Sequence, residues 1–137
     1  MPWNAANDNK KIIQRNLFKT KIKNMKNYLL LYRTDYSTMS QNNPDQAETI
    51  MKKWMDWLGN IAAQNKLVSR GDRLHNSGKI VKSNNVVTNG PYTDIKESIG
   101  GYSIIKAESY DEAVEFAKGC PVLTTGGNVE VREVDVM

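Results

Sequence analysis

The sequence predicts an α+β domain in which a split βαβ unit forms one antiparallel sheet and both helices lie on one face of it. Apolar residues alternate in strand-like runs and recur every three or four positions in two helix-like runs. These runs follow the order strand, helix, several strands, helix, strand. Strands that are apolar on both faces need more cover than two helices provide, so we expect a second copy of the chain to cover the other face.

The first strand is expected at residues 26–34, where both sets of alternating side chains are largely apolar. One face carries Tyr28, Leu30 and Tyr32, and the other carries Leu29, Leu31 and Arg33. This pattern is typical of a strand that is covered on both sides.

A long helix is expected to begin after Asn43, whose side chain can cap it. Pro44 suits the first helical position, and Gln46 can reach back to complete a capping box. The stripe that we expect to be buried consists of Ala47, Ile50, Met51, Trp54, Trp57, Leu58, Ile61 and Ala62.

Further strands are expected at residues 66–74 and 101–108, with a strand or hairpin formed by 79–82 and 85–88. A short helix follows, because Ser109 and Glu112 have the spacing of a capping box. Its apolar face is Ala113, Val114 and Ala117, and it ends at Gly119 and Pro121. The last strand is expected at 128–136.

The formal net charge of +4 is unevenly distributed along the 137 residues. Residues 1–24 hold six basic side chains and one acidic one, whereas the remainder holds 13 basic and 14 acidic. A basic extension on a near-neutral body argues against a nucleic-acid partner. We therefore expect 1–24 to be an extension outside the core and 25–137 to be one domain.

The sequence predicts neither a membrane segment nor a metal or cofactor site. Apolar runs such as residues 29–31 are far too short to span a membrane, so we expect a cytoplasmic protein. His75 is the only histidine, which excludes a histidine cluster within one chain. His75 could titrate near neutrality as a ligand or proton-transfer group, although a surface or capping role is the simpler interpretation. Cys120, the only cysteine, has no base beside it in the sequence and suits a buried structural thiol.

The last strand changes polarity midway. Val129 and Val131 share one face, while Glu130 and Arg132 share the other. If the two valines pack on the helices, Glu130 and Arg132 point into the space between the sheet and a second subunit. There Arg132 could hold a carboxylate or phosphate, or it could form an ion pair within the chain. Arg33 is open to the same two interpretations.

The segment 88–97 combines turn residues with polar and charged side chains. A turn at Gly90 and Pro91 needs no further function. Polar side chains on a loop held by a scaffold also commonly form binding sites. The candidate ligand-binding residues here are Tyr92, Asp94, Lys96 and Glu97.

The chain resembles the DGPF branch of the YCII-related family from about residue 25 to its end. The resemblance rests on Thr88, Asn89, Gly90, Pro91, Tyr92, Thr93, Asp94, Ile95, Lys96 and Glu97, on Gly100, Gly101 and Tyr102, and on Val129, Glu130, Val131 and Arg132. In the motif itself, Asn replaces Asp and Tyr replaces Phe at positions 89 and 92.

The resemblance implies a ferredoxin-like fold that pairs into a dimeric α+β barrel, with ligands bound in the cleft between sheet and helices. Some YCII-like proteins carry a His and Asp pair proposed to be catalytic. The first expected helix contains no His, so that pair cannot be carried over to this chain.

Two functions follow from these observations. The first is a homodimeric domain that binds or senses a small molecule, favoured because no nucleophile–base or metal constellation is visible in the sequence. The second is a cofactor-free enzyme of isomerase, lyase or hydrolase type acting on a small polar or aromatic acid. In that case Asp94, Glu97 or His75 would transfer protons and Arg132 would hold the anion.

Overall fold

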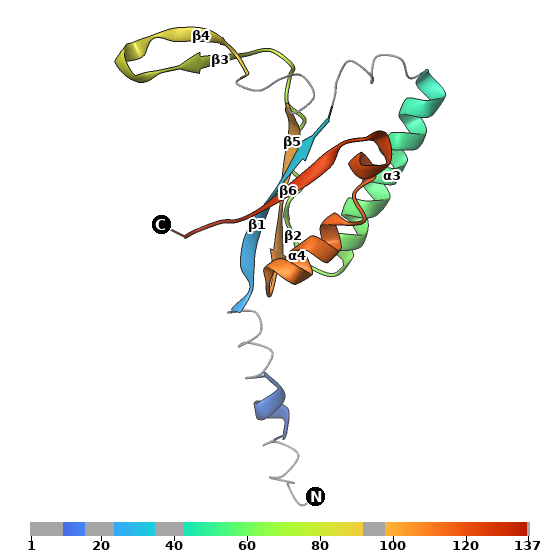
Figure 1. The fold of residues 1–137 in the computed structure, drawn as a ribbon. Helices are drawn as coiled ribbons and strands as arrows, with labels where there is room; N and C mark the ends of the chain where they lie inside the picture. Colours follow the sequence, from blue (N-terminus) through green and yellow to red (C-terminus); the bar gives the residue numbers. More distant parts are fainter. Residues whose placement is uncertain (1–9, 16–23, 35–42, 92–97, 137) are drawn as a thin grey trace, which may run out of the picture.

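The computed structural model describes residues 10–15, 24–34, 43–91 and 98–136 (Figure 1). Its main sheet has four strands in the order β2-β5-β1-β6, and every neighbouring pair is antiparallel. The strands are β1 (Lys26–Arg33), β2 (Leu67–Ser69), β5 (Ile99–Ala107) and β6 (Asn128–Glu133). The first and third core strands lie side by side in the middle, which is the ferredoxin-like order.

The two helices that pack on this sheet, α3 (Pro44–Ala63) and α4 (Tyr110–Ala117), lie on the same side of it (Figure 1). A 3-10 helix, η3 (Pro121–Thr125), leads from α4 toward β6. The core between sheet and helices is formed by Tyr28, Leu30, Tyr32, Ile61, Ile105, Ala107, Ala113, Ala117, Cys120 and Val122. The predicted α+β arrangement, with its helices on one face, is confirmed.

The other side of the sheet, which we call the open face, has an apolar centre. In the register of β1 and β5, Leu29 lies opposite Ile104 and Leu31 lies opposite Tyr102. These four side chains are half-buried, whereas their neighbours along each strand are buried against the helices. Since successive side chains of a strand point to opposite faces, the four form one apolar surface that no helix of the described residues covers.

The capping box expected at the start of α3 is present. The Asn43 side chain accepts from the Gln46 backbone N–H, and the Gln46 side chain accepts from the Asn43 backbone N–H. The predicted buried stripe is only partly correct. Leu58 and Ile61 are buried, but Ala47 and Ala62 are exposed and Met51 is 61% exposed. Both buried residues lie in the C-terminal half of α3, the half in which Trp54 and Trp57 also contact Tyr32 of β1.

Two expected strands are shorter than the sequence pattern indicates. The strand expected at 66–74 is reduced to β2 and one bridge between Arg73 and Gly101. Gly71, at φ 70°, interrupts it in the left-handed region. The last strand ends at Glu133 rather than at residue 136.

The second helix agrees with the sequence pattern, since the Ser109 hydroxyl accepts from the Glu112 backbone N–H and caps it. Ala113 and Ala117 are buried, but Val114 is exposed. The predicted face of this helix is therefore correct except at Val114.

The predicted hairpin is β3 (Gly78–Val81) and β4 (Val87–Gly90), which form a separate two-stranded sheet. A short 3-10 turn, η1 (Ser83–Asn85), joins them, with Asn84 and Asn85 at positive φ. In Figure 1 the hairpin extends from the end of the main sheet, away from both helices. It is an insertion between the second and third strands of the ferredoxin-like core.

Candidate functional site

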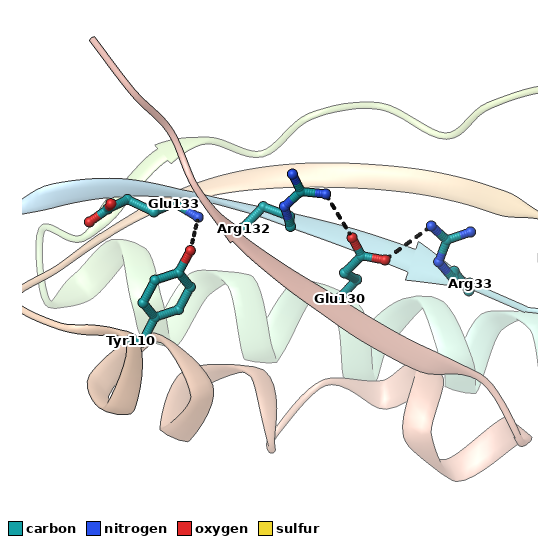
Figure 2. Close-up of polar contacts among 5 residues, drawn as sticks. All are labelled: Arg33, Tyr110, Glu130, Arg132 and Glu133. Carbon is teal, nitrogen blue, oxygen red and sulfur yellow. Dashed lines mark hydrogen bonds and ion pairs between the residues drawn. The ribbon is translucent and has the colours of Figure 1, made fainter.

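Three of the predicted site residues meet on the open face (Figure 2). Arg33 Nη2 donates to Glu130 Oε1 over 3.1 Å, and Arg132 Nη1 donates to Glu130 Oε2 over 3.3 Å. We call Arg33, Glu130 and Arg132 the arginine–glutamate cluster. One carboxylate thus binds a guanidinium group on each of its oxygens.

Strand pairing explains how the cluster forms. In the register of β1 and β6, Leu31 lies opposite Glu130, while Leu29 lies opposite Arg132. Arg33, two residues beyond Leu31, is therefore the diagonal neighbour of Glu130 on the same face. Val129 and Val131 pack on the helix side against the core. The face expected for Glu130 and Arg132, opposite the two valines, is the one that the structure shows.

Electrostatics holds Glu130 in its charged form. Hydrogen bonds from Arg33 and then from Arg132 lower the pKa of the Glu130 carboxyl below its usual value. The three side chains differ in exposure, with Arg33 partly covered and Arg132 68% exposed. Arg132 is therefore oriented by Glu130 on one edge of its guanidinium group while most of that group faces solvent.

The far end of β6 is fixed by different contacts. The Glu133 backbone N–H donates to the Tyr110 hydroxyl of α4 over 2.9 Å (Figure 2). The Glu133 carboxylate pairs with Lys26 over 3.1 Å. The Tyr110 hydroxyl thereby satisfies an outward backbone N–H of this edge strand.

His75 lies in the segment between β2 and β3 and makes local contacts. Its Nδ1 lies 3.0 Å from the Ser77 hydroxyl, and both residues are exposed. The nearby Asp72 carboxylate accepts from the Tyr102 hydroxyl at 3.5 Å, a long contact. Tyr92, Asp94, Lys96 and Glu97 lie outside the described residues.

The sequence did not indicate a buried polar chain on the helix side of the sheet. The Tyr32 hydroxyl donates to Ser103 Oγ over 2.7 Å, and Ser103 Oγ donates to the Arg70 carbonyl over 2.7 Å. Burial raises the pKa of Tyr32 above its ordinary value. Each hydroxyl has a hydrogen-bond partner, so these linked hydrogen bonds stabilise the core and need no ligand. The alternation of β1 predicts that Tyr32 is buried but gives no indication of its partner.

Cys120 is buried near the Tyr32 side chain, as expected for a structural thiol. Burial raises its pKa to about 12, which keeps the unreactive thiol form at neutral pH.

The region described by the structure offers no metal centre. Within residues 10–15, 24–34, 43–91 and 98–136, no three His, Cys, Asp or Glu side chains are grouped so that they could hold a metal ion. In the same segments, no helix has the length and apolar character needed to cross a membrane.

Sheet order, helix placement and the separate hairpin define this chain as a ferredoxin-like α+β domain. It belongs to the YCII-related domain family, whose match covers residues 25–137. The narrower DGPF branch stays a prediction from the motif.

No curated protein matches the chain. Among solved structures, it is similar to 5-chloro-2-hydroxyhydroquinone dehydrochlorinase (TftG) from Burkholderia phenoliruptrix AC1100, in complex with 2,5-dihydroxybenzoquinone. The two share 20% sequence identity at a TM-score of 0.39, over 80% of this chain and 95% of that chain. Similarity at this level carries no conclusion about the substrate of the present chain.

Proposed function

We propose that this chain forms a homodimeric domain that binds a small organic anion, with Arg132 holding the anionic group. The observation that carries the proposal is the position of Arg132. Its guanidinium group is oriented by Glu130 and mostly exposed, and in the strand register it lies beside the apolar Leu29. A guanidinium group next to an apolar surface suits a carboxylate or phosphate that is attached to a small apolar body.

The dimer is supported by the apolar centre of the open face. Leu29, Leu31, Tyr102 and Ile104 are adjacent in the register, and within the described segments no helix lies over them. Monomeric proteins rarely leave such a surface to water, and a second identical sheet is the partner with the same shape and polarity. A two-fold axis through this face would bring an arginine–glutamate cluster from each copy to the interface.

The ligand is better accommodated on the open face than between sheet and helices, where the resemblance had suggested it. On the helix side, Tyr32, Trp54 and Trp57 pack edge to face with ring centroids 4.7 to 6.1 Å apart. These rings fill the space beneath the second half of α3, whereas Arg132 points to the other side of the sheet.

The experiment is titration calorimetry of the purified full chain with benzoate, salicylate, succinate and inorganic phosphate. At least one of these anions should bind, and Arg132→Ala should weaken that binding at least tenfold. Lys106→Ala is the matched control, since Lys106 is a basic residue of β5 that alternation places on the same open face. The two variants should have similar melting temperatures, because Arg132 is largely exposed.

Equal affinity of the wild type and Arg132→Ala for every anion that binds would contradict the role of Arg132. The same incubations, followed by chromatography of the small molecule, test the alternative of a cofactor-free enzyme. Unchanged ligand supports a binding domain, whereas a converted ligand supports the enzyme.

A further inference from the structure

The β3–β4 hairpin is the part of the described chain that the proposed function does not use. Its strands bond to each other and form their own sheet, apart from the four-stranded one. It extends away from α3 and α4 (Figure 1). A two-stranded hairpin is marginally stable in water by itself, so one that leaves its domain needs another surface to hold it.

The hairpin carries an apolar surface that is exposed in the single chain. Val81 and Val87 are directly opposite each other in its register and are 69% and 57% exposed. Val86, next to them, is also exposed. Single exposed valines are ordinary, but two valines directly opposite each other on paired strands form one apolar patch suited to a protein surface.

The charge of the hairpin indicates what kind of protein surface it would bind. The hairpin, residues 78–90, contains two basic side chains, Lys79 and Lys82, and no acidic one. The rest of residues 25–137 contains 11 basic and 14 acidic side chains, a net charge of −3. The hairpin is therefore complementary in charge to the body of its own domain, from which it extends away.

We propose that the hairpin is an arm that packs on the body of a second copy of this chain. This inference rests on the proposed dimer and adds a second contact to it. A two-fold axis gives each copy one arm and one receiving surface, so both hairpins are held at once. The valine patch supplies apolar contact, and the lysines favour the acidic body of the other copy.

Sedimentation equilibrium of the full chain tests the arm. Val81→Ser combined with Val87→Ser removes apolar surface without changing charge, and it should raise the dimer dissociation constant by about tenfold. Val114→Ser is the matched control, because Val114 is an exposed valine on α4, on the helix side of the sheet. It should leave the dissociation constant unchanged.

Hydrogen exchange on the unmodified protein provides a test that needs no variant. Amides of residues 78–90 should become protected as the protein concentration rises through the dissociation constant. Two results together would contradict the arm but not the dimer. They are protection from exchange that is confined to β1 and β5, and a dissociation constant that the double variant leaves unchanged. A wild type that stays monomeric at all concentrations would overturn the dimer and the arm together.

Discussion

Arg33 and Glu130 lie 97 positions apart in the sequence, yet their side chains form an ion pair of 3.1 Å. The pair is partly exposed, so its contribution to folding is small. Its larger effect is positional, since Arg33 fixes the carboxylate that orients Arg132. Removal of the Glu130 carboxylate is therefore expected to release the Arg132 guanidinium from its orientation while lowering the stability of the fold only slightly.

Glu130→Gln should make unfolding less dependent on pH in the acid range. The hydrogen bonds from Arg33 and Arg132 lower the pKa of Glu130 in the folded state. The stability from this group is present above the pKa of the unfolded carboxyl and is lost as pH falls through the folded pKa. In urea unfolding, the free energy of unfolding of the wild type should exceed that of the variant by about 0.5 kcal/mol at pH 7, and the two should converge as the pH falls below the folded pKa of Glu130.

Glu108→Gln is the control for this prediction, since Glu108 is an exposed carboxylate near the start of α4. A gap between wild type and Glu130→Gln that stays constant from pH 7 to pH 3 would contradict the electrostatic explanation.

The sequence predicted the faces of the site residues but not their partners. Alternation placed Glu130 and Arg132 opposite Val129 and Val131, which is what the strand shows. The pairing with Arg33 depends on β1 and β6 being neighbours in a particular register, a consequence of the tertiary fold. Periodicity within one segment carries no information about which strand lies beside it.

At the scale of elements, short sequence patterns predicted where helices begin more accurately than where strands end. The capping residues Asn43 and Ser109 act on backbone within a few positions, so sequence patterns determine them. The extent of the expected second strand depends on a distant contact instead, because Gly71 interrupts it against the backbone of Tyr102.

Gly71→Ala and Gly59→Ala should change stability in opposite directions. A Cβ at Gly71 would lie 1.7 Å from the Tyr102 carbonyl oxygen, and φ there is +70°. Gly71→Ala should therefore lower the free energy of unfolding, measured in urea, by about 3 kcal/mol. Gly59 lies within α3 with nothing within 4 Å of an added Cβ, so alanine should stabilise by about 1 kcal/mol.

The Gly59 variant also controls for the general effect of replacing glycine by alanine. A Gly71→Ala protein as stable as the wild type would show that the backbone at Tyr102 can shift without cost.

At the scale of the whole molecule, the most informative sequence feature was that two helices are too few to cover both faces of the sheet. Two helices lie on one face, and the other face remains apolar at its centre. The sequence could not reveal that the hairpin lies outside the main sheet, because its alternating pattern resembles that of any paired strands.

Deletion of residues 1–24 should leave the domain folded. The described residues of this extension, 10–15 and 24, are exposed. The family match begins at residue 25. The melting temperature of the shortened protein should lie within a few degrees of that of the full chain. A fall of more than about 10 °C would show that the extension packs on the domain.

The packing of α3 on β1 also provides an optical reporter. Trp54 and Trp57 contact Tyr32 edge to face, and Trp57 Nε1 donates to the Phe116 carbonyl. Of the three tryptophans in the chain, only Trp3 lies in the extension. A protein that lacks residues 1–24 would therefore emit only from indoles packed between helix and sheet. A red shift of that fluorescence would report the detachment of α3 from β1 without any added dye.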